Sequence, residues 1–249
     1  MAGKLTEKLL PAALQVYFKQ TRSHFFGLLS ILFLLVIYES SSATIYADQQ
    51  IQIRNSAEVM IERVLWFAGI RNNMLLWVVY LLILVWAFWL AKKQNLLSFK
   101  FVYIPYSIFE STVYALLLGL IAGKLTERTS FLMLQSQEEL TTMGAKATLA
   151  LGAGIYEELL FRFILISLFS LIFEKLVGGK RTVYDLLAVA IAAMLFSGFH
   201  YLGGREAFTF ESFLFRFYAG VILGMLFVLR GIGVTSYTHA IYNLLLIFR

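Results

Sequence analysis

Long runs of hydrophobic residues recur along most of the chain, separated by shorter polar connections. An apolar stretch of about 18 or more residues is long enough to cross a bilayer as a helix. The pattern therefore predicts an all-α transmembrane bundle with about seven spanning helices, at residues 25–46, 74–91, 101–122, 146–173, 183–201, 211–229 and 233–248. The last segment has only about 16 residues, at about 1.5 Å each, so we expect it to lie inside the bundle.

The polar segments are amphipathic in part. Residues 4–20 predict an interfacial helix with its lipid side formed by Leu5, Leu9, Leu10 and Leu14. The connections 48–73 and 123–145 are the longest, and the first has helical apolar spacing at Val59, Ile61, Val64, Leu65 and Phe67. We expect both connections to lie along the membrane interface. The chain then divides into an interfacial segment at 1–23, a part with three spans at 24–143, and a bundle of the last four spans at 144–249.

Composition agrees with the membrane interpretation. Hydrophobic residues make up 60% of the 249 residues and charged residues 14%, whereas soluble domains have about 25% charged residues. The absence of cysteine excludes disulfides, thiolate metal sites and a cysteine nucleophile. The net charge of +6 contains no Lys/Arg run dense enough for nucleic-acid binding. The predicted partner is therefore the lipid bilayer, and no nucleic acid is expected.

The basic residues also predict an orientation in the cell membrane. If the N-terminus is cytoplasmic, the inner segments contain Lys4, Lys8, Lys19, Arg22, Lys92, Lys93, Lys100, Lys175, Lys180, Arg181 and Arg230. The outer connections are balanced, since Arg54, Arg63 and Arg71 in 48–73 offset Asp48, Glu58 and Glu62. An excess of Lys and Arg marks cytoplasmic loops, so the bias favours a cytoplasmic N-terminus.

Three charged residues lie well inside the fourth apolar segment, namely Glu157, Glu158 and Arg162. A charge near the bilayer centre costs about 2.5–3.5 kcal/mol on insertion scales, so such groups normally face the protein interior and find partners. Glu158 and Arg162 are four residues apart on one helical face and predict an ion pair. Glu157 is rotated by about 100° and has no partner on its own helix. It is therefore the candidate for chemistry, although the same pattern also fits a buried packing pair.

Further polar groups follow on the fifth and seventh segments. The fifth ends in Phe196-Ser197-Gly198-Phe199-His200, and a lone histidine at a helix end is often only a capping or interfacial residue. His239 and Asn243 are four residues apart on the short seventh segment, so both point to one side and need partners. Gly220 and Gly224 on the sixth segment predict close helix packing.

These residue types together outline a hydrolytic site. A carboxylate beside a histidine, here Glu157 and His200, can bind a water molecule and take its proton. A second histidine with an asparagine, here His239 and Asn243, can donate hydrogen bonds to a developing oxyanion. The set predicts hydrolysis of an acyl bond by an activated water molecule, without a nucleophilic side chain.

At these positions the sequence resembles the CPBP intramembrane proteases, the CAAX proteases and bacteriocin-processing enzymes that include the type II CAAX prenyl endopeptidases. Glu157 to Arg162 matches their Glu-Glu-x-x-x-Arg motif, Phe196 to His200 matches Phe-x-x-x-His, and His239 to Asn243 matches His-x-x-x-Asn. An aromatic-x-x-Gly stretch also matches, at Phe217 to Gly220. The resemblance covers about residues 144–247.

The resemblance implies an intramembrane endopeptidase of the glutamate type that needs no metal or other cofactor. It implies that Glu157 and His200 activate water and that His239 and Asn243 stabilise the oxyanion. Glu158, Arg162, Phe196 and Gly220 are then supporting residues. The implied substrate is a peptide or a lipidated, membrane-bound protein. The prenyl endopeptidases cut a three-residue tail from a lipidated cysteine, whereas many bacterial relatives act in bacteriocin maturation, self-immunity or protein sorting.

Two alternatives stay open at the level of sequence. Two histidines and a glutamate can bind zinc, although no His-Glu-x-x-His run is present. A transporter or scaffold could instead use buried Glu and His to relay protons or hold a ligand, and Glu39 and Glu110 would then gain importance.

The depth of the site also poses a problem. In the predicted topology His200 lies at the outer end of the fifth segment, while His239 follows closely on the inner start of the seventh. Either the fifth segment continues through Tyr201 and Leu202, or the seventh does not begin at the inner surface.

Overall fold

The computed structural model describes residues 11–49, 54–69, 73–93, 100–125, 142–177, 180–202 and 207–247. The helices in this part of the chain are α2 (Ala12–Thr21), α3 (His24–Gln49), α4 (Ser56–Phe67), α5 (Asn73–Lys93), α6 (Tyr103–Leu125), α8 (Met143–Gly152), η1 (Ala153–Ile166), α9 (Ser167–Val177), α10 (Arg181–Phe199), α11 (Phe210–Arg230) and α12 (Ile232–Ile247). No strand occurs among the described residues, and the predicted all-α class is confirmed.

The predicted spans all fall on helices, with α8, η1 and α9 following one another directly in the fourth. Within the described ranges, four helices are long and apolar enough to cross a membrane, namely α3, α6, α10 and α11. The count of about seven spans is therefore not confirmed. Leu14 on α2 is exposed as predicted, whereas Leu5, Leu9, Leu10 and most of the 123–145 connection lie outside the described residues.

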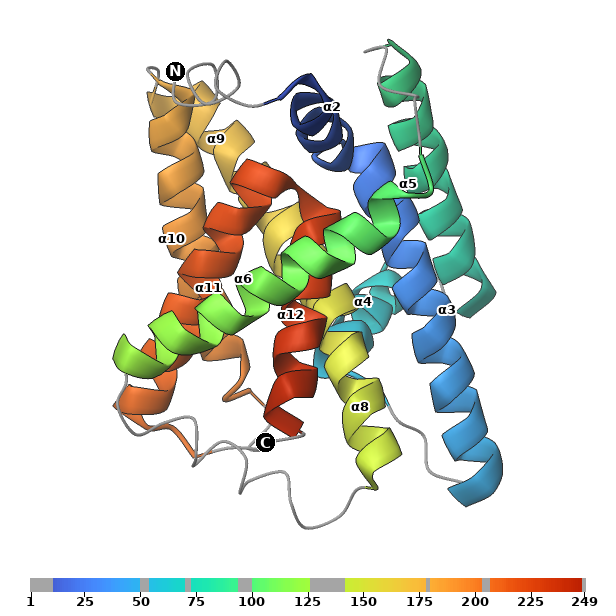
Figure 1. Cartoon of the computed structure of the whole chain (residues 1–249). Coiled ribbons are helices and arrows are strands. Elements are labelled where there is room, and N and C mark those ends of the chain that lie inside the picture. The colour runs from blue at the N-terminus through green and yellow to red at the C-terminus, as the bar shows by residue number, and fades with distance from the viewer. Residues whose placement is uncertain are drawn as a thin grey trace.

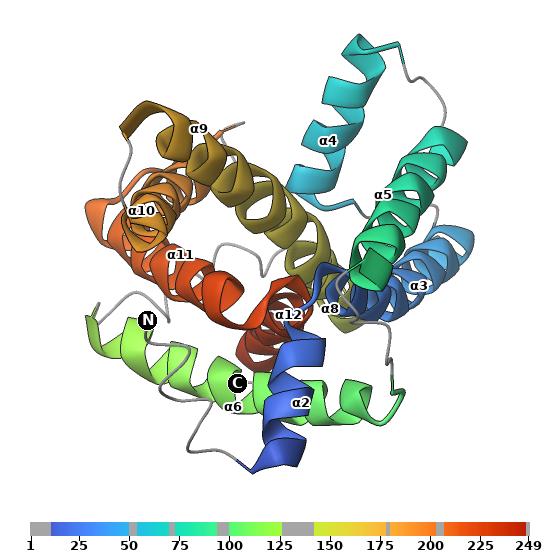
Figure 2. The ribbon, with the colours of Figure 1, turned by 90° about the horizontal axis from the view of Figure 1, so that it is seen from above.

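Helix α12 lies at the centre of the bundle, surrounded by α3, α6, α8, η1 and α11 (Figures 1 and 2). Its first nine residues, from Ile232 to Ala240, are all buried. The expectation that the short last segment lies inside the bundle is confirmed. Helix α6 crosses the front of the bundle obliquely (Figure 1), so α12 is covered on that side too.

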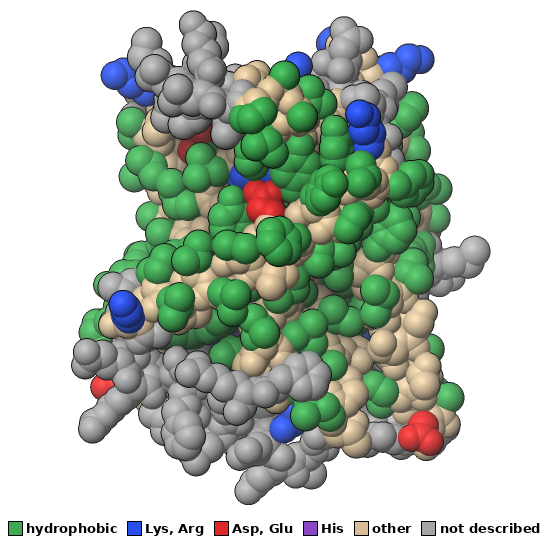
Figure 3. Space-filling model, in the orientation of Figure 1, with side chains coloured by type: hydrophobic (Ala, Val, Ile, Leu, Met, Phe, Trp, Pro, Cys, Tyr) green, Lys and Arg blue, Asp and Glu red, His purple; other side chains and the backbone are tan. Residues whose placement is uncertain are grey.

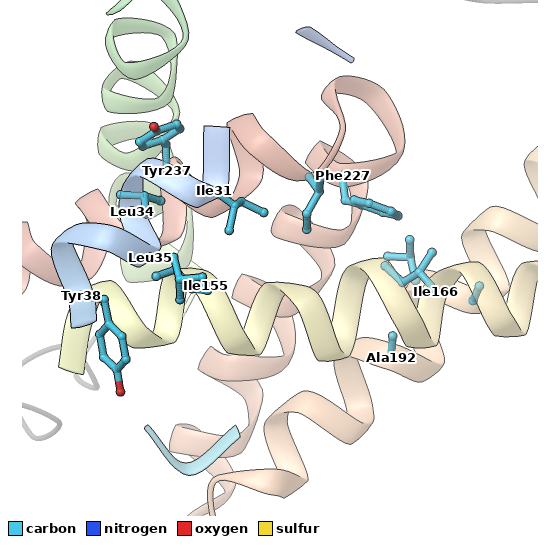
Figure 4. Packing of buried hydrophobic residues seen from close by; sticks show 12 residues of the cluster. Ile31, Leu34, Leu35, Tyr38, Ile155, Ile166, Ala192, Phe227 and Tyr237 are labelled. Carbon is cyan, nitrogen blue, oxygen red and sulfur yellow. The ribbon is translucent and has the colours of Figure 1, made fainter. Parts of the chain in front are cut away.

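The largest apolar core forms around η1. Ile155 and Ile166 of η1 pack with Ile31, Leu34 and Leu35 of α3, and with residues of α10, α11 and α12 (Figure 4). The outer surface is also apolar, because large hydrophobic side chains such as Leu120 and Leu171 are exposed. In Figure 3, hydrophobic side chains cover the middle of the face in view, while most of the visible Lys and Arg side chains lie nearer its ends. This surface fits a membrane protein.

Small residues allow α11 to lie close to α10. A Cβ atom on Gly220 would lie 3.0 Å from the Cβ of Ala193, and one on Gly224 would lie 2.8 Å from a methyl group of Val189. The predicted packing role of these two glycines is confirmed. The contact places the end of α10, which carries Phe196 and His200, against the first half of α11.

A buried ion pair anchors the N-terminal helix α2 to the bundle. Arg230, at the end of α11, donates to both carboxylate oxygens of Glu110 on α6, over 2.6 and 2.8 Å. The Tyr17 hydroxyl of α2 donates to the same carboxylate over 2.6 Å, and Arg230 also donates to Thr21 Oγ1 over 2.9 Å. Glu110, which had no place in the hydrolytic scheme, therefore has a structural role.

The turn from α11 to α12 lies beneath α2. Gly231 has a φ of 81°, and a Cβ there would lie 2.8 Å from the carbonyl oxygen of Arg22. Helix α12 consequently begins below the upper ends of α5 and α10 (Figure 1), while α10 ends at Phe199. The sequence left two ways to bring His200 and His239 to a similar depth. The structure favours the one in which the seventh predicted segment starts inside the bundle.

Removing either partner of the Glu110–Arg230 pair should destabilise the protein. A buried charge that loses its partner costs about 3–5 kcal/mol of unfolding free energy. Glu110→Ala and Arg230→Ala should each lower the unfolding temperature in detergent, and the double variant should lose less than the sum because the two share one interaction. The control is Arg181→Ala, whose side chain is 82% exposed and 3.7 Å from Asp185. Equal stability of Arg230→Ala and Arg181→Ala would contradict the anchoring role.

Candidate functional site

The Glu157–Arg162 motif lies on a π-helix, η1, and not on the α-helix that the sequence analysis assumed. A π-helix has hydrogen bonds from residue i to i+5, and such segments occur frequently at functional sites. The helix begins where the chain packs tightly, since a Cβ on Gly152 would lie 2.7 Å from the Tyr38 ring. The α-helical angle of about 100° between Glu157 and Glu158 therefore does not apply here, although the two carboxylates still differ in their partners.

Glu158 is the centre of a buried ionic cluster. It is fully buried, and its Oε1 lies 3.0 Å from Nη1 of Arg162, so the predicted ion pair is present. The same oxygen lies 2.6 Å from Nδ1 of His239 on α12. The Arg162 guanidinium also stacks 4.3 Å from the ring centre of Phe196. Glu158 thus links η1 to α12, a contact that the sequence did not predict.

Glu157 faces different partners with each of its oxygens. Oε1 accepts a hydrogen bond from Nδ2 of Asn55 over 3.2 Å, and Oε2 lies 3.9 Å from Nε2 of His239. The residue is 7% exposed. Both of these contacts come from other elements, while Arg162 on the same helix interacts with Glu157 through its charge.

Small residues on η1 and α12 set the distance between Glu158 and His239. A Cβ on Gly154 would lie 2.6 Å from Ala240 Cβ and 2.8 Å from the Ser236 carbonyl oxygen. Since His239 directly precedes Ala240, this close approach holds the imidazole against the glutamates. Replacement of Gly154 by any larger residue would force the two helices apart.

His200 lies at the C-terminal end of α10, where its Nδ1 donates to the Phe196 carbonyl oxygen over 2.9 Å. The Phe196 ring is 4.9 Å from the His200 ring and 6.1 Å from the His239 ring, centre to centre, so it contacts both. Gly220 makes room for Phe196, because a Cβ there would lie 3.2 Å from its ring.

The hydrogen bond to Phe196 sets the tautomer of His200. A carbonyl oxygen can only accept, so Nδ1 carries the proton in this contact. With Nδ1 carrying the proton that it donates to Phe196, Nε2 of the neutral ring has a free lone pair. That nitrogen can accept a proton.

Asn243 lies one helical turn after His239 on α12 and is partly buried. None of the described residues forms a hydrogen bond with its side chain. The predicted site residues therefore divide into two groups. Glu157, Glu158, Arg162, Phe196, His200 and His239 are brought into one cluster from η1, α10 and α12, while Asn243 extends the His239 face of α12.

Two residues of the site were missed by the sequence analysis. Asn55 precedes α4 and contacts Glu157; the run Asn55-Ser56-Ala57-Glu58 has the form of a helix N-terminus, which could have predicted α4 but not its contact. Arg216 on α11 is buried and donates to Tyr201 and Ser212 over 3.0 and 2.6 Å. Arg216 could have been predicted as a buried residue with partners, because it is a charged residue within an apolar segment.

Metal-ligating side chains are not clustered in the part of the chain that the structure describes. No group of three or more His, Asp or Glu residues among these residues has an arrangement suited to a metal ion. The metal independence implied by the family resemblance remains a prediction.

The comparisons with known proteins concern the same helices. No curated protein and no solved structure gave a significant match to the chain. Residues 140–245 match the family model described as type II CAAX prenyl endopeptidase Rce1-like. This range contains all the motifs from Glu157 to Asn243 that carry the resemblance noted in the sequence. The family is a protease family, and residues 140–245 are similar to it over the helices that carry these motifs.

Proposed function

We propose that this protein is an intramembrane endopeptidase that cleaves a peptide bond with a water molecule activated by Glu157 and His200. The observation that carries the proposal is the buried cluster of Glu157, Glu158 and His239, which joins two helices within the matched residues 140–245. Glu157 faces both Asn55 and His239 without a strong ion pair of its own. Such a carboxylate is available to take a proton.

In the proposed reaction, water lies between Glu157 and His200 and gives up a proton to Glu157. The resulting hydroxide attacks the carbonyl carbon of the scissile bond and forms a tetrahedral intermediate. The intermediate collapses when the C–N bond breaks, and the leaving nitrogen receives the proton. The products are a new carboxyl terminus and a new amine. General acid–base catalysis of this kind contributes about 10²–10⁴-fold to the rate.

His239 and Asn243 are proposed to stabilise the oxyanion of that intermediate. When the His239 ring is protonated, Nδ1 donates to Glu158 over 2.6 Å, and Nε2 keeps a proton for a second acceptor. Asn243 lies one turn further along the helix and offers an amide donor. Glu158 then acts through His239, by fixing the orientation of its ring.

The substrate is proposed to be a peptide segment of a membrane-associated or lipidated protein. Support comes from the matched family, whose description names prenyl endopeptidases, and from the apolar side chains exposed on the surface of the bundle. A substrate held in the bilayer would reach a site formed by buried helices without crossing an aqueous phase.

Glu157→Gln should abolish cleavage while the protein still accumulates and folds in the membrane. The substitution keeps the shape of the side chain but removes the base, which typically costs about 10²–10⁴-fold in kcat. The measurement is steady-state cleavage of a membrane peptide by purified protein. Glu158→Gln is the matched comparison on the same helix, and it should lower thermal stability as well, since it leaves Arg162 without its partner. Wild-type turnover by Glu157→Gln would refute the assignment.

Asn243→Ala should lower kcat by about 10²–10³-fold with little change in KM, because an oxyanion donor acts mainly in the transition state. His239→Ala should have a similar effect on kcat, and the double variant should lose less than the product of the two losses. A proton-relay transporter would depend on His239 alone. Full activity of both single variants in the cleavage assay would remove α12 from the site.

Purified active protein should contain no stoichiometric zinc, and chelators should leave its cleavage activity largely intact. The reason is that the proposed water is activated by a carboxylate and an imidazole, not by a metal. Elemental analysis of the purified protein tests this directly. About one zinc per chain, lost in His200→Ala, would support the zinc mechanism instead.

A further inference from the structure

Asn55 reaches the site from outside the part of the chain that matches the family model. It lies directly before α4, 102 positions from Glu157 in the sequence and outside the matched residues 140–245. Its side chain is nevertheless buried, at 7% exposed, and its Nδ2 donates to Oε1 of Glu157 over 3.2 Å. The N-terminal part of the chain therefore supplies a direct contact to the proposed base.

The orientation of the Asn55 amide is fixed from both ends. Oδ1 accepts a hydrogen bond from the backbone N–H of Ala57 over 2.8 Å and so caps α4. The amide nitrogen must then point away from the helix, toward the carboxylate. If the positions of Oδ1 and Nδ2 were exchanged, the hydrogen bond to Ala57 would be lost and the amide oxygen would lie against the Glu157 oxygen.

The backbone at Asn55 is held by a polar network on α3 and α4. The Tyr38 hydroxyl donates to Glu58 and accepts from the Asn55 N–H. Arg54 pairs with Glu58, and it lies 3.4 Å from Glu39. A Cβ on Gly152, the last residue of α8, would lie 3.1 Å from that of Asn55, so the junction of α8 and η1 packs directly on this segment. Glu39 therefore helps to hold the backbone at Asn55 through Arg54.

The hydrogen bond makes the two oxygens of Glu157 inequivalent. Oε1 is occupied by Asn55, whereas Oε2 faces Nε2 of His239 at 3.9 Å. A carboxylate held at one oxygen cannot rotate freely, so Asn55 determines which oxygen is presented to the reacting water.

We propose that Asn55 is a positioning residue for Glu157, and that the site is complete only when α4 is docked on η1. The inference rests on the proposed function of Glu157 as the base. The charged and titratable groups that interact with this carboxylate are Arg162, His200 and His239. Glu158 is its neighbour in the sequence, and Tyr38, Arg54 and Glu58 form the network that holds Asn55.

The test compares Asn55→Ser with Asn55→Asp in the purified full-length protein. Both replacements are good N-cap residues, so α4 should keep its start. Both lose the amide donor to Glu157, and Asp also places a second carboxylate against the first. Misplacement of a reacting group by about 1 Å can cost about 100-fold in rate, so we expect Asn55→Ser to lose about 10- to 100-fold in kcat. Asn55→Asp should lose more, and KM should stay near the wild-type value in both.

If Asn55 had only a structural role, Asn55→Ser should lose more kcat than Asn55→Asp, because Asp is closer to Asn in shape than Ser is. Thr142→Ala is the matched control, since it removes the N-cap of α8 and contacts none of the proposed catalytic residues. Thr142→Ala should lower the unfolding temperature, because α8 loses its N-cap, but it should leave kcat unchanged. Wild-type kcat in both Asn55 variants, or losses that follow only the unfolding temperature, would overturn the proposal.

The same set of variants separates the two proposals. If Glu157→Gln cleaves as well as the wild type, the proposed function fails whatever Asn55 does. If Glu157→Gln is inactive while Asn55→Ser and Asn55→Asp retain full kcat and KM, the peptidase assignment stands and the role of Asn55 is wrong.

Discussion

The buried contact of Glu158 with Arg162 and His239 is the interaction on which the rest of the site depends. It places a carboxylate, a guanidinium and an imidazole together where 0% of Glu158 is exposed. A buried charge that loses its partner costs about 3–5 kcal/mol, so separation of these three groups would be unfavourable in the folded protein. Because they come from η1 and α12, their pairing fixes the relative position of the two helices. Glu157 and His239 are then held within 3.9 Å of each other.

Close backbone packing makes this contact possible, and elements outside residues 140–245 complete the site. Gly154 lets α12 lie directly against η1, and Gly220 leaves space for the Phe196 ring between the two histidines. The N-terminal helices contribute in two ways. Helix α2 and Glu110 on α6 hold the end of α11 through Arg230, which sets where α12 begins. The segment before α4 brings Asn55 to Glu157.

The sequence could predict much of this, for specific physical reasons. Charged and polar residues are costly inside apolar segments, so Glu157, Glu158 and His239 stood out, and the four-residue spacing predicted the Glu158–Arg162 pair. The π-helix could not be predicted, since the pattern of apolar positions does not distinguish a local shift from i+4 to i+5 bonding. The Asn55 contact depends on how a helix folds back over a separation of 102 residues. The roles of Glu110 and Glu39 likewise depend on partners distant in sequence, and the catalytic roles and the number of spans remain predictions.

Capture of substrate by the Glu157→Gln protein tests the central claim most directly, because a base-deficient site should bind peptide without cutting it. The variant would be expressed in membranes and purified with its bound peptides, which are then identified by mass spectrometry. Our account predicts that the enriched peptides come from membrane-associated proteins and that each is cut at a single bond by purified wild-type protein. Enriched peptides that wild-type protein leaves intact, under conditions in which it is folded, would contradict a peptidase centred on Glu157.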